Sequence, residues 1–155
     1  MNAARRFIAA LAGASLLGAC TTPPKSEVPQ GFGVYQGGEV RQAASFDRVV
    51  YQVKRVDNKP YANLEFWRIA LKERLAKTGY VVTADGELSA AGKPGYFIET
   101  TAPRGVADYM YLVALFVRDK DLVVIEAAGE LQAYKAQREK IFAAIKASDF
   151  AGGGR

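Results

Sequence analysis

Three apolar segments in the second half of the chain most strongly limit what it can fold into. Residues 96–101, 109–117 and 122–128 each have the length and the aromatic and β-branched content of a β-strand. Only the tetrapeptide Arg118-Asp119-Lys120-Asp121 separates the last two segments, so we expect them to form an antiparallel hairpin. Residues 109–117 read YMYLVALFV, and such a nearly continuous apolar run is typical of a strand covered on both faces. The sequence therefore predicts an antiparallel sheet with this segment at its centre.

The preceding part of the chain predicts a hairpin, a strand and a helix. Residues 32–35 and 39–43 flank Gly37-Gly38, which is typical of a short hairpin. Residues 46–56 alternate between apolar and polar side chains, as a half-buried strand does. Apolar residues at helical spacing then indicate a helix that ends at Gly79, with an inner face formed by Leu64, Trp67, Leu71 and Leu75.

Three further segments complete the predicted fold. Residues 80–83 predict a short strand, and the glycines and proline of residues 85–94 predict a loop. Residues 130–148 predict a closing helix, whose inward positions are Leu131, Tyr134, Ile141 and Ile145. This order of elements predicts one domain over residues 31–150 of the α+β class, with a single mostly antiparallel β-sheet packed by two main helices.

The same elements carry a resemblance to a known family. The strand–helix–strand block of residues 46–83, the segments YFIETT, DYMYLVALFV and LVVIEAAGE, and a closing helix that ends in IFAAIKASDF resemble the Mog1/PsbP-like family. The resemblance covers residues 32–150 and implies an α/β sandwich. Bacterial members are often small lipoproteins without an assigned role, and the resemblance transfers no functional residue to this chain.

The N-terminus predicts export and attachment to a membrane. Arg5 and Arg6 precede a short apolar run, which predicts that residues 1–19 are a signal peptide. Leu17-Gly18-Ala19-Cys20 resembles the lipobox of bacterial lipoproteins, and Cys20 is the only cysteine. The resemblance implies cleavage before Cys20 and acylation of Cys20 with fatty acids such as palmitate, since two or more acyl chains anchor a protein stably. An ordinary secretory signal with a chance cysteine is the alternative.

The anchor leads to further expectations about the neighbouring residues and the membrane. Residues 20–30 contain three prolines and no apolar periodicity, which predicts a flexible tether, and residues 151–155 predict a disordered tail. Thr21 follows the cysteine, where lipoproteins kept at the inner membrane commonly have Asp. The resemblance therefore implies the outer membrane, facing the periplasm, if the cell has two membranes.

The composition argues against several functions. The chain has no histidine, and acylated Cys20 could not serve as a nucleophile or a metal ligand. We therefore expect no metal site, no cofactor and no enzymatic activity. Removal of residues 1–19 lowers the net charge from +5 to +3, which is too small an excess to predict a nucleic-acid partner.

One group of residues suggests a ligand site. The short hairpin predicts that Val113 lies opposite Glu126, and we expect Glu99 opposite Tyr111 in the neighbouring strand. Glu99, Tyr111 and Glu126 would then share one face of the sheet. The opposite face would be the core, with Tyr96, Ile98, Met110, Leu112, Val123 and Ile125.

Two interpretations of this group remain open. It could be a shallow recess that binds a small cationic or polyhydroxy ligand. It could instead be structural, either exposed to solvent or paired with a helix cation such as Arg138.

The first hypothesis for function is a membrane-anchored, non-enzymatic envelope protein that binds or scaffolds another envelope component. The alternative is a small-ligand carrier, or a carboxylate-dependent hydrolase that uses Glu99 and Glu126.

Overall fold

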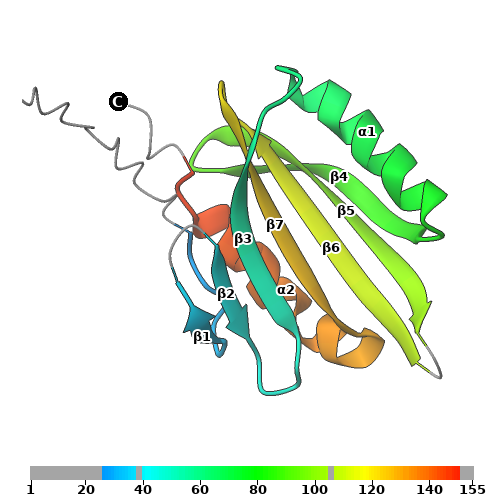
Figure 1. The fold of residues 1–155 in the computed structure, drawn as a ribbon. Coiled ribbons are helices and arrows are strands. Elements are labelled where there is room, and N and C mark those ends of the chain that lie inside the picture. Colours follow the sequence, from blue (N-terminus) through cyan, green and yellow to red (C-terminus); the bar gives the residue numbers. More distant parts are fainter. Residues whose placement is uncertain (1–25, 38–39, 105–106, 151–155) are drawn as a thin grey trace, which may run out of the picture.

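A computed structural model describes residues 26–37, 40–104 and 107–150 of the chain (Figure 1). It forms one seven-stranded antiparallel sheet with two helices, so the predicted α+β class is confirmed. The predicted signal peptide, Cys20 and the predicted tail at residues 151–155 lie outside the described residues. Within the described residues, no helix is long and apolar enough to cross a membrane.

The sheet contains every strand of the described chain in one continuous antiparallel array. Its spatial order is β1-β2-β3-β7-β6-β5-β4, so β6 and β7 lie in its interior, as the apolar run of β6 predicts. The strands, in chain order, are β1 (Gly33–Gln36), β2 (Arg41–Ala44), β3 (Val50–Asp57), β4 (Val81–Ala90), β5 (Lys93–Arg104), β6 (Ala107–Val117) and β7 (Asp121–Glu130). The predicted N-terminal hairpin is confirmed as β1 and β2, although residues 38–39 of its turn lie outside the described residues.

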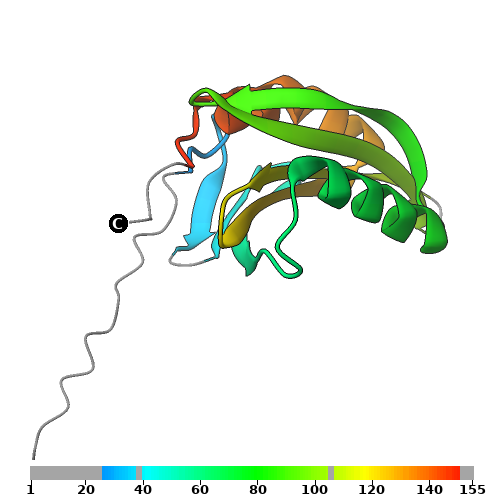
Figure 2. The same ribbon diagram turned by 90° about the horizontal axis from the view of Figure 1, so that it is seen from above.

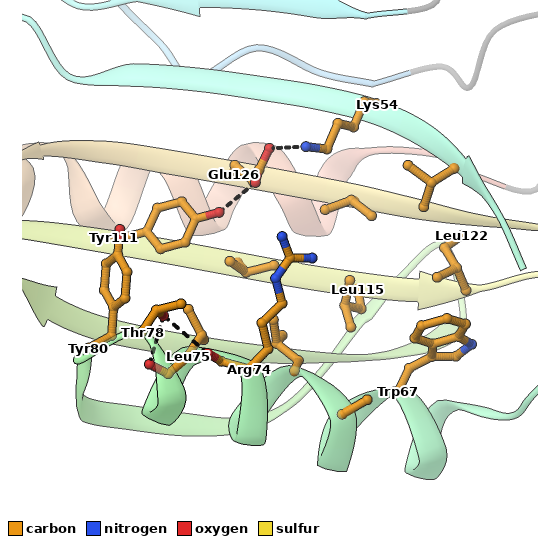
Figure 3. A pocket seen from close by; sticks show the side chains of 15 residues that line it. Lys54, Trp67, Arg74, Leu75, Thr78, Tyr80, Tyr111, Leu115, Leu122 and Glu126 are labelled. Atoms are coloured by element: carbon orange, nitrogen blue, oxygen red, sulfur yellow. Dashed lines mark hydrogen bonds and ion pairs between the residues drawn. The ribbon is translucent and has the colours of Figure 1, made fainter. Parts of the chain in front are cut away.

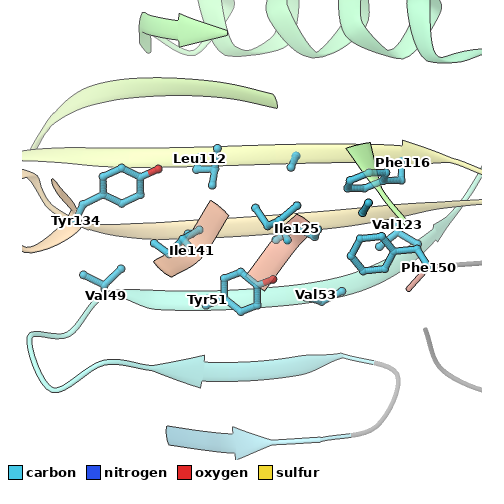
Figure 4. Close-up of a cluster of buried hydrophobic side chains, with 14 of the residues drawn as sticks. Val49, Tyr51, Val53, Leu112, Phe116, Val123, Ile125, Tyr134, Ile141 and Phe150 are labelled. Atoms are coloured by element: carbon cyan, nitrogen blue, oxygen red, sulfur yellow. The ribbon is translucent and has the colours of Figure 1, made fainter. Parts of the chain in front are cut away.

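The two helices, α1 (Leu64–Lys77) and α2 (Leu131–Ala147), pack against opposite faces of the sheet (Figure 2). The sheet curls around α2, which contacts the edge strand β4 as well as β6 and β7. The larger core lies on this side (Figure 4), and its largest fully buried members are Tyr51, Phe116, Tyr134 and Phe150. The smaller core lies under α1 and includes Leu75, Tyr96, Ile98, Val113 and Leu115.

The predicted loop at residues 85–94 is wrong, because most of it belongs to β4 and the start of β5. Residues 81–90 pair with residues 93–101, and the turn between them has Ala91 and Gly92 at φ 47° and 74°. Two successive residues with positive φ are typical of the tight turns that join twisted strands. Pro94 is tolerated because it precedes Tyr96, where the pairing of β5 with β6 begins.

Helix α1 is fixed firmly at its ends and more loosely along its length. Asn63 caps its N-terminus by accepting a hydrogen bond from the backbone N–H of Phe66 at 3.0 Å. The predicted inner face is confirmed, but Leu75 is its only fully buried residue, and Phe66 and Ile69 on the other side are exposed. The helix therefore rests on the sheet through one row of side chains.

A buried asparagine connects the start of α1 to the turn between β6 and β7. Asn58 donates from Nδ2 to the carbonyl oxygens of Ala62 and Arg118, each at 3.1 Å. Its Oδ1 accepts from the indole Nε1 of Trp67 at 2.8 Å. The side-chain amide thus satisfies backbone groups that a loop would otherwise leave unpaired, and it fixes the orientation of the indole.

The segment before β1 is packed against the domain, which corrects the predicted tether for residues 26–30. Ser26 and Pro29 are buried, and Arg41 donates to the carbonyl oxygen of Ser26. The backbone N–H of Glu27 donates to Ser148 Oγ at 2.8 Å. The start and the end of the described chain therefore lie side by side.

Candidate functional site

The structure confirms half of the predicted strand register that placed Glu99, Tyr111 and Glu126 together. Val113 lies opposite Glu126 across β6 and β7, as the short hairpin predicts. Glu99, however, lies opposite Leu112 rather than Tyr111 across β5 and β6. Because successive side chains of a strand point to opposite faces, this one-residue difference moves Glu99 to the other side of the sheet. Tyr96 and Ile98, which alternate with Glu99 along β5, change faces in the opposite direction: the prediction placed them in one core with Leu112, but they belong to the core under α1.

Glu99 is a buried carboxylate beneath α2 that forms an ion pair with the half-exposed Arg138. Arg138 donates to both carboxylate oxygens, from Nε at 2.8 Å and from Nη2 at 2.7 Å. Tyr134 also donates to Oε1 at 2.7 Å, and burial together with this carboxylate raises the pKa of the Tyr134 phenol. Arg138 and Tyr134 thus supply hydrogen-bond donors to the buried carboxylate, and the pairing with Arg138 is the one that the structural interpretation predicts. Glu99 is therefore not part of a recess with Tyr111 and Glu126.

Glu126 and Tyr111 do meet, on the face that α1 partly covers. The Tyr111 hydroxyl donates to Glu126 Oε1 at 2.5 Å, and Lys54 Nζ lies 2.7 Å from Oε2. Gln52 donates to the same Oε2 at 3.2 Å. Burial, followed by the hydrogen bond to Glu126, raises the pKa of the Tyr111 phenol. Three donors from β3 and β6 thus hold the Glu126 carboxylate in place.

A cavity of about 440 Å³ lies between α1 and this face of the sheet (Figure 3). We call it the α1 groove. It exists because α1 lies over β4, β5 and β6 and leaves the neighbouring face of β7 and β3 uncovered. One wall is formed by α1 and its C-cap, with the residues Trp67, Ala70, Leu71, Arg74, Leu75 and Thr78. The sheet and Tyr80 supply the rest of the lining: Lys54, Val56, Tyr80, Tyr111, Val113, Leu115, Leu122, Val124 and Glu126.

The lining of the α1 groove changes in character along its length. Trp67, Leu115 and Leu122 lie at one end, while Tyr80 and Tyr111 lie at the other (Figure 3). The two tyrosine rings are in contact, with centroids 5.6 Å apart. Arg74 reaches from α1 across the groove between the two ends (Figure 3). The sequence could not indicate this groove, because its lining comes from α1, β3, β6 and β7 and shares no motif.

Within the part of the chain that the structure describes, Glu126 is the only carboxylate that lines the α1 groove, and its oxygens already accept from Tyr111 and Gln52 and pair with Lys54. Among the described residues, no three histidine, cysteine or acidic side chains are grouped closely enough to hold a metal ion.

Comparisons with known proteins identify the fold but no family. No protein-family model and no curated protein sequence matches the chain. Among solved structures, LpqN of Mycobacterium tuberculosis, described as involved in cell envelope biogenesis, matches with a TM-score of 0.65 and 8% identity over 86% of this chain and 87% of its own. Protein PA94 of Pseudomonas aeruginosa, of unknown function, matches with a TM-score of 0.58 and 10% identity over 74% of this chain and 94% of its own. At 8% and 10% identity, the two matches show that the chain shares its α+β fold with both proteins, and they show the fold alone.

Proposed function

We propose that this chain is a lipid-anchored protein of the bacterial cell envelope, whose domain binds another envelope component through the α1 groove and catalyses no reaction. The observation that carries the proposal is the groove itself, a preformed concave site with a mostly apolar lining and a few fixed polar groups. The lipobox-like residues that end at Cys20 support the anchor. The fold shared with LpqN, which is described as involved in cell envelope biogenesis, is consistent with an envelope role.

The positions of the two glutamates argue against the hydrolase alternative. Glycoside hydrolysis needs two carboxyl groups on either side of one substrate bond. Glu99 lies beneath α2 with Arg138, whereas Glu126 lies on the opposite face of the sheet with Lys54. No single substrate could contact both carboxylates. The carrier alternative does not depend on this pair and remains compatible with the α1 groove.

The anchor is tested by mass spectrometry of the protein extracted from membranes. We expect a mature chain that begins at an acylated Cys20, and we expect Cys20→Ala to abolish both cleavage and acylation. Thr21→Ala serves as the matched control, because it changes the neighbouring residue and leaves the acylated thiol in place. An unmodified cysteine in the membrane-extracted protein would contradict the anchor.

The binding function is tested by photo-crosslinking in intact cells. A benzophenone amino acid at Leu71, which lines the α1 groove, is expected to form a specific adduct. The same probe at Lys140, an exposed position of α2 on the other side of the sheet, is the matched control. Adducts of equal yield at the two positions, or none at Leu71, would rule out the groove as the binding surface.

A further inference from the structure

The α1 groove has an apolar end and a polar end, and this division indicates the chemistry of the ligand that would fit it. At the apolar end, the indole of Trp67 is held by Asn58 beside Leu115 and Leu122 (Figure 3). At the polar end lie two phenols and the Glu126 carboxylate. A molecule that fills the groove would therefore place a hydrocarbon portion at one end and a polar group nearer the other.

The charges that line the groove are not balanced. Lys54 is paired with Glu126 at 2.7 Å, and the same carboxylate also accepts from Gln52 and Tyr111. Arg74 makes no ion pair with any carboxylate of the described residues. One positive charge is thus left over at the middle of the groove, where it favours an anionic group.

The contacts that hold α1 indicate that the fold keeps the groove open. The Asn58–Trp67 hydrogen bond ties the beginning of the helix to the turn between β6 and β7, and Leu75, buried against the sheet, holds its last turn in place. Between these ends, Ala70 is the smallest side chain that faces the groove. A helix held at both ends cannot close onto the sheet, so the space beside it persists.

We propose that the α1 groove binds a single-chain amphiphile with an anionic headgroup, whose hydrocarbon chain lies along Trp67, Leu115 and Leu122 and whose headgroup pairs with Arg74. This inference rests on the proposed function and names its ligand class. A volume of about 440 Å³ lies in the range of small-molecule sites. At the apolar end, Leu115 and Leu122 offer no hydrogen-bonding group to a sugar and the Trp67 N–H already donates to Asn58, while the Arg74 guanidinium disfavours a cationic ligand.

The fluorescence of Trp67 provides a direct measurement, because it is the only tryptophan of the chain and lines the groove. The full chain with Cys20→Ala is titrated with dodecyl phosphate below its micelle concentration. We expect saturable binding and a shift in Trp67 emission. Replacing dodecyl phosphate with decyl or octyl phosphate should weaken binding about threefold to fourfold for each methylene removed.

The headgroup contact is tested with matched variants on the same helix. Arg74→Ala should weaken the binding of dodecyl phosphate about fivefold, since an ion pair to an exposed guanidinium is lost. Lys77→Ala removes an equal charge from a position that is also exposed but does not line the groove, and it should change binding by less than twofold. Ala70→Phe should block the groove for any amphiphile, with thermal unfolding of each variant as the check that it folds.

Any of four results would overturn the inference. The headgroup assignment is wrong if dodecanol binds as tightly as dodecyl phosphate, or if Arg74→Ala weakens both equally. The ligand class is wrong if no alkyl phosphate binds while the Leu71 probe crosslinks to a protein in cells, an outcome that would leave the proposed function intact. If both the titration and the crosslinking fail, the proposed function fails as well.

Discussion

Glu99 and Arg138 form a two-point ion pair across the interface between β5 and α2, with distances of 2.8 and 2.7 Å. The Glu99 side chain is 3% exposed, whereas that of Arg138 is 43% exposed. The pair therefore places a carboxylate within the core while the guanidinium remains at its rim.

Loss of this guanidinium should destabilise the domain. Arg138→Ala is expected to lower the free energy of unfolding by about 2–4 kcal/mol, because it leaves a buried carboxylate with only Tyr134 as donor. Lys135→Ala, at an exposed position of the same helix, should change it by less than about 0.5 kcal/mol. Urea unfolding measures both, and similar stability of the two variants would contradict the role of the pair.

Alkaline pH should also destabilise the domain. Burial is the main cause that raises the pKa values of Tyr51, Tyr96, Tyr111 and Tyr134 above their usual value of 10.0. The folded state thus keeps these phenols neutral, and the associated stability is present below pH 10 and lost as the pH rises above it.

Unfolding experiments between pH 9 and pH 11 test this dependence. Tyr134→Phe should reduce the decline in stability above pH 10 by up to about 1.4 kcal/mol per pH unit. Tyr35→Phe, at an exposed position of β1, is the control and should leave the slope unchanged. An unchanged slope in Tyr134→Phe would show that this phenol ionises equally in both states.

Gly95 should not tolerate a side chain. A Cβ at this position would lie 2.6 Å from the Phe116 ring and 2.8 Å from the carbonyl oxygen of Leu115. Gly95→Ala is therefore expected to cost about 1–3 kcal/mol through overpacking. Gly33→Ala, with no atom within 4 Å of its Cβ, is the matched control. Thermal unfolding compares them, and a neutral Gly95→Ala would mean that Phe116 can move away.

The docking of residues 26–30 relies in part on the hydroxyl group of Ser148. Ser148→Ala removes the acceptor of the Glu27 backbone N–H and should cost about 1–2 kcal/mol. It should also speed proteolysis of the segment before β1. Ser89→Ala on the exposed side of β4 should do neither. Equal protease resistance of the two variants would show that the segment is held by other contacts.

The sequence predicted the fold class because the relevant signals were local. The four residues Arg118–Asp121 leave little freedom for the pairing of β6 with β7, and the predicted contact of Val113 with Glu126 is confirmed. The end of α1 at Gly79, which has φ 82°, and the inner face of Leu64, Trp67, Leu71 and Leu75 are equally local signals. The anchor at Cys20 and the resemblance to the Mog1/PsbP-like family stay predictions, since nothing in the described residues tests them.

The site was harder to predict because it depends on relations between distant segments. The connection from β5 to β6 does not fix the register, and β5 is covered by a helix on each face, so its alternation did not show where Glu99 points. In β4, Gly86 and the polar residues resembled a loop, yet Gly86 lies under the Phe97 ring, 3.2 Å from where its Cβ would be. The groove itself comes from four elements, which no single stretch of sequence reveals.

A series of hydrogen bonds connects the end of the chain to the α1 groove. Arg118 donates to the carbonyl oxygen of Phe150 at 3.0 Å, Asn58 donates to that of Arg118, and Trp67 donates to Asn58. The apolar end of the groove thus lies at the same pole as Ser26 and Ser148. Six residue steps separate Ser26 from Cys20, a reach of at most about 20 Å. With the proposed anchor, this pole would face the bilayer, and a hydrocarbon chain could pass from the lipid to Trp67 with little exposure to water.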